Sequence, residues 1–140
     1  MIDNHDIFAL PRHFVVISTL GEMEMVCTAL NTRPGSSCAL VSEPDAGCFM
    51  GVAWWMALTA GAGMPAFLDC GMAAARAAEG LRAGLGGVIV EPACTQHDAL
   101  AQLAGTMGAT CLRGRPGAHV IAGPDAADAL QRYLRSHPAG

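Results

Sequence analysis

The feature that most constrains this chain is a repeated alternation of short apolar runs with longer stretches rich in alanine and leucine. The runs are mainly apolar instead of alternating with polar residues, which is typical of strands covered on both faces in a parallel sheet. They occupy residues 14–18, 37–42, 66–69, 88–91, 109–112 and 119–122. The first five are far enough apart for one helix and two turns between neighbours, which is the βαβ unit.

The sixth run departs from this alternation because only residues 114–118 separate it from the fifth. Such a short connection cannot hold a crossover helix, so it favours an antiparallel edge strand or a single bent strand. The sequence therefore predicts one α/β domain, residues 1–140, with an N-terminal arm over 1–12. The expected fold is a three-layer sandwich, with a mostly parallel five-stranded sheet and helices on both faces, and in outline it resembles flavodoxin-like and Rossmann-like folds. The alternative is a half-barrel-like fragment that is completed by association.

Composition excludes several classes of protein. With 52% hydrophobic and 14% charged residues among 140, the chain is not intrinsically disordered. Its formal net charge of -4 argues against a nucleic-acid partner and against a polybasic membrane-surface protein. All eight cationic side chains, excluding histidine, are arginines. The absence of lysine excludes Schiff-base aldolases, pyridoxal-phosphate enzymes, Walker-A nucleotide binders and protein kinases, which all need that amine.

A cytoplasmic location is expected from three further observations. The opening residues carry no positive region ahead of an apolar stretch, so they do not form a secretory signal. The longest apolar run, 48–62, is shorter than the roughly 20 residues that span a bilayer, so no membrane partner is expected. The six cysteines form no C-x-x-C pair and lie in apolar runs, which indicates reduced, mostly structural thiols.

The segment 48–58 indicates self-association because it contains no charged residue. A helix that is apolar on every side must be covered on every side, and consecutive tryptophans point about 100° apart. We therefore expect a homo-oligomer, with a dimer favoured. The alternative is a central helix buried by its neighbours and by the N-terminal arm. The expected interface residues are Phe49, Trp54, Trp55 and Met56.

Polar residues follow the apolar runs where a ligand would bind. In open α/β sheets, ligands bind beyond the carboxyl ends of the strands. The expected ligand-binding residues at those positions are Ser18, Thr19, Glu43, Cys70, Arg113 and Arg115. The two arginines flank a glycine in a short loop and suit a small anionic ligand, such as a phosphate or a carboxylate.

Two constellations at the same edge would suit an enzyme. Asp69 and Glu91 end neighbouring units and would form a carboxylate pair for acid and base chemistry, unless each simply caps the next helix. Cys94 and His97 would form a thiol activated by an imidazole, unless they are a buried cysteine and a surface histidine. The spacing of these four residues matches no zinc signature, and the sequence identifies no cofactor.

Two functions follow from these patterns. The first is a small oligomeric module that binds an anionic ligand or a protein partner at the strand ends. The second is a small cytoplasmic lyase, isomerase or hydrolase that uses Asp69 with Glu91, or Cys94 with His97. The sequence leaves open whether the protein is an enzyme.

Overall fold

The computed structural model describes residues 10–33 and 37–136 of the chain. Most of the predicted N-terminal arm therefore lies outside the described residues. The strands and helices alternate, as expected from the apolar runs. In chain order they are β1 (His13–Val16), α2 (Leu20–Asn31), β2 (Cys38–Val41), α3 (Ala46–Phe49), α4 (Val52–Thr59), β3 (Ala66–Asp69), α5 (Ala74–Ala83), β4 (Gly87–Val90), α6 (His97–Met107), β5 (Thr110–Arg113), β6 (His119–Val120) and α7 (Ala126–Arg135).

The strands form one six-stranded sheet in the order β5-β4-β3-β2-β1-β6, and every neighbouring pair is parallel. The predicted α/β fold with a parallel sheet is confirmed. The expected antiparallel edge strand is wrong: the sixth strand pairs in parallel with β1, where Val15 is opposite His119 and Val16 is opposite Val120. The sheet therefore has six strands instead of five, and the chain crosses from one edge to the other between β5 and β6.

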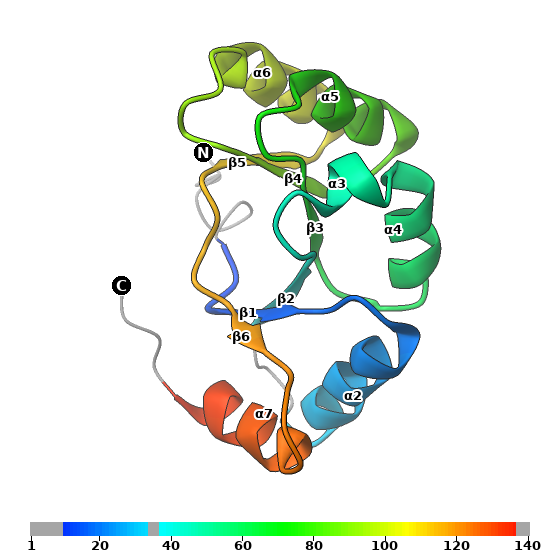
Figure 1. Cartoon of the computed structure of the whole chain (residues 1–140), viewed down its shortest axis with the longest axis vertical. Coiled ribbons are helices and arrows are strands. Elements are labelled where there is room, and N and C mark those ends of the chain that lie inside the picture. Colours follow the sequence, from blue (N-terminus) through cyan, green and yellow to red (C-terminus); the bar gives the residue numbers. More distant parts are fainter. Residues whose placement is uncertain (1–9, 34–36, 137–140) are drawn as a thin grey trace, which may run out of the picture.

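The short β5–β6 connection requires the sheet to be curved. Six residues of extended chain, from Arg113 to His119, reach at most about 20–22 Å. Five strand spacings in a flat sheet would require about 24 Å. The sheet must therefore twist or curl so that its two edges approach each other. Figure 1 shows this curve, with the helices along its outer side and the connection running from β5 to β6 along the other.

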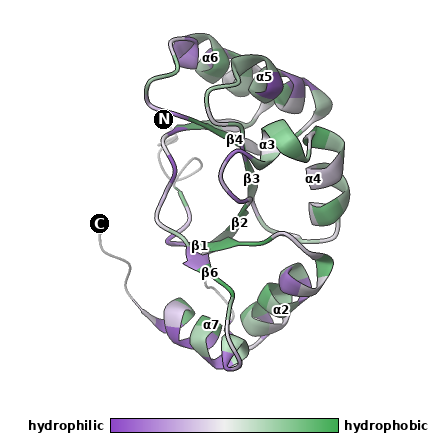
Figure 2. Ribbon diagram, viewed as in Figure 1, coloured by the Kyte–Doolittle hydropathy of each residue, from purple (hydrophilic) through white to green (hydrophobic). Residues whose placement is uncertain are grey.

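Alternate residues of each strand enter two separate apolar clusters, one on each face of the sheet. The larger cluster contains Val15, Leu40, Leu68, Val88 and Val90 together with buried residues from all six described helices. The smaller one contains only strand residues among its buried members, and Leu112 and Ala118 pack against it. Figure 2 shows hydrophobic colour along β2 and β4, and hydrophilic colour at β6 and on segments of α2, α5 and α7. Among the described residues, the face of the sheet that carries the smaller cluster is thus covered by irregular chain and not by helices. A half-barrel-like fragment, the alternative expected from the sequence, would share this feature.

The handedness of parallel connections accounts for this one-sided arrangement. The connections from β1 to β5 all move in the same direction across the sheet, so right-handed crossovers place their helices on one face. The connection from β5 to β6 moves in the opposite direction, and a right-handed crossover then lies on the other face. Ala118, which belongs to that connection, packs against the smaller cluster as this rule requires.

The uncharged segment 48–58 is two helices instead of one. Gly51 has φ +91°, a left-handed conformation that favours glycine, and it separates α3 from α4. Trp55 lies in the core with no exposed surface, and Trp54, half-buried, packs against it with ring centroids 5.6 Å apart. Phe49 and Met56 remain exposed. Of the four expected interface residues, Trp55 is therefore covered by its own chain.

Candidate functional site at the carboxyl ends of the strands

Because all six strands are parallel, their carboxyl ends meet at one edge of the sheet. Ser42 follows β2, Asp69 is the last residue of β3, Glu91 follows β4, and Arg113 is the last residue of β5. Arg115 lies two residues further on, in the connection to β6. The parallel sheet thus gathers polar residues that are far apart in the sequence.

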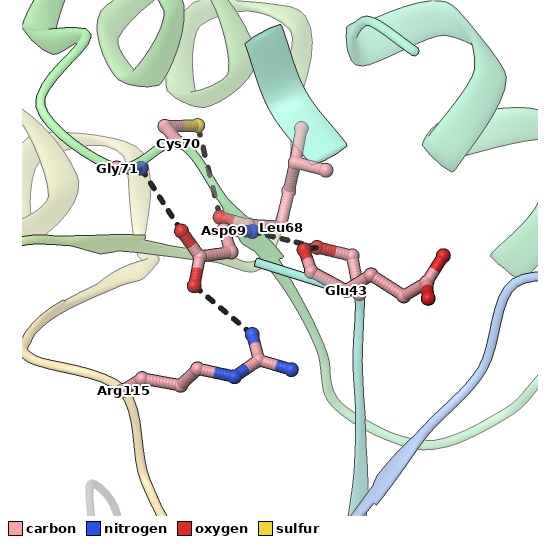
Figure 3. Close-up of polar contacts among 7 residues, drawn as sticks. Glu43, Leu68, Asp69, Cys70, Gly71 and Arg115 are labelled. Atoms are coloured by element: carbon pink, nitrogen blue, oxygen red, sulfur yellow. Dashed lines mark hydrogen bonds and ion pairs between the residues drawn. The ribbon is translucent and has the colours of Figure 1, made fainter. Parts of the chain in front are cut away.

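Asp69 is the best-connected side chain at this edge (Figure 3). It is buried, and its Oδ1 accepts a hydrogen bond from the Gly71 N–H at 2.9 Å. Its Oδ2 accepts a hydrogen bond from Nη1 of Arg115, also at 2.9 Å. Both carboxylate oxygens are therefore engaged, one by backbone and one by a cation, which holds the carboxylate in a single orientation.

Ser42 fixes the backbone of the same residue. Its side chain is fully buried, and its Oγ accepts a hydrogen bond from the Asp69 N–H at 2.9 Å while donating one to the Glu43 carbonyl at 3.0 Å. Ser42 is not among the ligand-binding residues expected from the sequence. The available signal was a hydroxyl at the end of an apolar run, where a buried hydroxyl needs a partner. Glu43, which was selected, is exposed, and Figure 3 shows its carboxylate pointing away from Asp69.

Arg115 reaches Asp69 from the β5–β6 connection. Its side chain is 26% exposed, whereas that of Asp69 is 7% exposed, so the ion pair lies at the boundary between protein and solvent. A guanidinium carries five N–H donors, and the contact with Asp69 uses Nη1. The pair therefore fastens the connection to the central part of the sheet and leaves a partly exposed guanidinium with further donors.

A close approach of two loops supports Asp69 from the other side. Gly71 has φ +57°, and a Cβ at this position would overlap the side chain of Asp45, whose own φ is +61°. The Gly71 carbonyl also accepts a hydrogen bond from the Glu91 N–H at 3.0 Å. The turns that follow β2, β3 and β4 thus meet at Gly71, where a Cβ would have to displace the side chain of Asp45.

Glu91 belongs to a different surface from Asp69. With Asp45, Cys48, Met72 and Ala73 it lines an open cavity of about 620 Å³ beside α3 and the start of α5. Asp69 is not among the lining residues, and its carboxylate faces Arg115. The structure therefore pairs Asp69 with an arginine, and it groups Glu91 with Asp45 instead of with Asp69.

The two thiols expected at this edge are both buried. Cys70 donates a weak hydrogen bond to the Leu68 carbonyl at 3.7 Å. Burial, and to a smaller extent the nearby Cys48 and Asp69, raises the pKa of Cys70 to about 12, so it is a neutral thiol at physiological pH. Cys94 donates to Oε1 of Gln96 at 3.6 Å.

His97 makes no hydrogen bond with the thiol of Cys94. Nδ1 of His97 lies 3.8 Å from Oδ1 of Asp98, beyond hydrogen-bonding distance. Both ring nitrogens are buried and have no hydrogen-bond partner among the described residues. The thiol proton of Cys94 is directed to Gln96, so the geometry lacks the hydrogen bond through which an imidazole activates a thiol.

Ser18 and Thr19, expected to bind a ligand, form the N-terminal cap of α2. Oγ1 of Thr19 accepts a hydrogen bond from the Glu22 N–H at 3.1 Å. The carboxylate of Glu22 in turn accepts hydrogen bonds from the Ser18 N–H at 2.8 Å and from its hydroxyl at 3.2 Å. These contacts resemble a capping box and use the side chains for local structure. Arg113 is exposed at the end of β5.

The described ranges 10–33 and 37–136 contain no cluster of three or more His, Cys, Asp or Glu residues arranged to hold a metal ion. No helix within them combines the length and the apolar character that crossing a bilayer requires.

Comparison of the chain with protein-family models, with curated proteins and with solved structures gave no match in any of the three. What the protein does is therefore inferred from its own residues, above all from Asp69 and Arg115.

Proposed function

We propose that the protein binds a small anionic ligand, a carboxylate or a phosphate ester, at the carboxyl ends of its strands. Arg115 is the residue that recognises it in this proposal. The observation that carries the proposal is a partly exposed guanidinium held in place by the buried carboxylate of Asp69. A guanidinium matches the geometry of carboxylates and phosphates and remains charged at every physiological pH.

Asp69 acts as the positioning residue in this arrangement. Its own orientation is set by the Gly71 N–H and by the contact of its backbone with Ser42. A side chain that is already ordered loses less conformational entropy when a ligand binds, so affinity per contact is greater. Arg113 adds a second positive charge at the same end of the sheet, because it is the last residue of β5.

A binding role has more support than the alternative, a lyase, isomerase or hydrolase. The carboxylate of Asp69 is engaged by Arg115 and is less available as a general base. The thiol of Cys70 is neutral, and that of Cys94 donates to Gln96. An enzyme would need one of these groups free and facing a bound substrate.

We also propose that the protein is a cytoplasmic homo-oligomer. Phe49 is 63% exposed and Met56 36% exposed, and half-buried Trp54 lies on the same helix as Met56. Aromatic residues and methionine are enriched at the centres of protein interfaces. These three residues form the surface that we expect a second copy to cover.

Ligand-induced stabilisation tests the binding site directly. The melting temperature of the purified protein is measured with increasing inorganic phosphate, and separately with citrate, at constant ionic strength. Saturable stabilisation is expected in the wild type, because a ligand that binds only the native state raises its stability. Arg115→Met should abolish this stabilisation, and Arg115→Lys should weaken it.

Arg135→Met is the matched control, since it removes an exposed arginine from α7, far along the chain from the strand ends. It should leave the stabilisation by phosphate or citrate unchanged. Equal stabilisation of the wild type and Arg115→Met by both anions would refute the proposed role of Arg115.

A further inference from the structure

A second cavity lies at the opposite end of the strands from Asp69 and Arg115. It has a volume of about 480 Å³ and is bounded by the last turn of α2, the start of β2 and the loop that precedes β3. The residues that line it are Pro11, Cys27, Leu30, Asn31, Ser37, Cys38, Ala62, Gly63, Met64 and Pro65. Three of them carry sulfur, and they come from three different elements of the fold.

The two thiols of this cavity come from a helix and a strand and differ in exposure. Cys38 is the first residue of β2 and is buried, whereas Cys27 lies on α2 and is half-buried. One thiol is thus partly accessible from solvent, and the other belongs to the core.

The hydrogen bonds of these thiols are weak and cost little to replace. Cys27 donates to the Ala62 carbonyl at 3.7 Å, and Cys38 donates to the Ala39 carbonyl at 3.7 Å. Both distances are near the outer limit for sulfur donors. Neither thiol is engaged by a carboxylate, a histidine or a cationic side chain in these contacts.

We propose that Cys27, Cys38 and Met64 form a binding site for a soft monovalent metal ion such as Cu(I). Two thiolates and one thioether are the ligands that Cu(I) prefers. The lining residues include no carboxylate and no imidazole, so hard cations such as Mg²⁺ and Ca²⁺ lack the charged oxygen ligands that usually bind them. The inference does not depend on the proposed anion site, which lies at the other end of the strands.

Binding at this site exchanges protons for the metal ion. The S–H bonds of Cys27 and Cys38 break, two protons pass to solvent, and two Cu–S bonds form, while copper stays in the monovalent state. The thioether of Met64 adds a third bond through a sulfur lone pair and releases no proton. Affinity should therefore fall steeply as the pH is lowered, with two protons taken up for each copper ion released.

A competition titration tests the site in the full-length reduced protein. Cu(I) is supplied without oxygen as its coloured complex with bicinchoninate, and loss of colour reports transfer to the protein. The wild type should take up one tightly bound equivalent. Cys27→Ala and Cys38→Ala should each lower the affinity for that equivalent at least tenfold, and Met64→Leu should lower it several-fold.

The matched control is Cys111→Ala, which removes another half-buried thiol that lies on β5. It should bind copper like the wild type. Near-ultraviolet circular dichroism confirms that each variant is folded, and Cys27→Ala is informative even where the buried Cys38 proves essential for folding. Wild-type affinity in Cys27→Ala would overturn the proposal, and wild-type affinity in Met64→Leu would overturn its three-sulfur form.

Discussion

The guanidinium of Arg115 contacts the buried carboxylate of Asp69 at 2.9 Å, although the two residues are 46 positions apart in the sequence. This contact joins the connection between β5 and β6 to the end of β3, across the face of the sheet that carries the smaller apolar cluster. It combines a structural task with a chemical one, because it secures an irregular segment and orients a partly exposed cation.

The Asp69–Arg115 pair should contribute to stability as a coupled unit. Arg115→Met leaves a buried carboxylate without its cation, so the free energy of unfolding should fall by about 2 kcal/mol. Asp69→Asn should cost a similar amount, and the double variant should lose clearly less than the two single losses together. Urea denaturation of the four proteins provides this double-mutant cycle. Strict additivity of the two losses would show that the residues do not interact.

The two tryptophans of α4 should differ in their contribution to stability. Trp55→Ala removes a fully buried ring and should lower the free energy of unfolding by about 3–5 kcal/mol, since the remaining cavity closes only partly. Trp54→Ala removes a half-buried ring and should cost clearly less when each tryptophan is replaced in the Phe49→Ser background, in which the proposed interface is weakened. Chemical denaturation measures both losses. Equal losses would contradict the assignment of Trp55 alone to the core.

Gly71 should tolerate alanine poorly for two separable reasons. Gly71→Ala places a Cβ at φ +57° and also against the side chain of Asp45. Gly108→Ala is the matched control, because Gly108 has φ +70°, close to that of Gly71, and a Cβ there would meet no atom within 4 Å. Backbone strain alone should cost about 1–2 kcal/mol in the control. A larger loss in Gly71→Ala, measured by thermal or urea unfolding, reports the overlap with Asp45.

His119 should make the protein less stable in acid. Its ring stacks on Tyr133 with centroids 4.9 Å apart, and burial lowers its pKa below the ordinary value of 6.5. As the pH falls below about 6.5, the unfolded chain takes up a proton at this residue before the folded one does. The resulting stability is complete above that pH and is lost as the pH falls toward the folded pKa.

The variant His119→Phe keeps the stacking and removes the titration. Unfolding measured at pH 7 and pH 5 should show a smaller loss of stability in this variant than in the wild type. Identical losses in the two proteins would mean that His119 titrates in the folded protein as it does in the unfolded chain.

Self-association should depend on the exposed apolar side chains of α3 and α4. Sedimentation at micromolar concentration should show an oligomer for the wild type, with a dimer as the expected species. Phe49→Ser removes the most exposed of the three expected interface residues and should shift the equilibrium toward monomer. Val120→Ser, which changes an equally exposed apolar residue on β6, should leave it unchanged. A monomeric wild type would remove the proposed interface.

The alternation of strands and helices could be read from the sequence because it depends on local pattern. The stretch 88–90 is apolar at every position, and this predicts a strand covered on both faces wherever it lies in the sheet. The gathering of Asp69 and Arg113 at one edge followed from the same pattern, since parallel strands place their carboxyl ends together. The break at Gly51 was harder to foresee, because a glycine between apolar residues also fits inside a helix.

Long-range geometry decided the remaining features. The short segment 114–118 suggested a hairpin, but curvature of the sheet brings the two edges close enough for β6 to pair with β1. The same curvature brings Arg115 to Asp69 and leaves Glu91 at another cavity. The local pattern of apolar residues does not encode that curvature, because it depends on the order in which all six strands lie in the sheet and on the short connection between its two edges. The sequence therefore determined which residue types lie at the strand ends, and the curvature of the sheet determined which of these side chains contact one another.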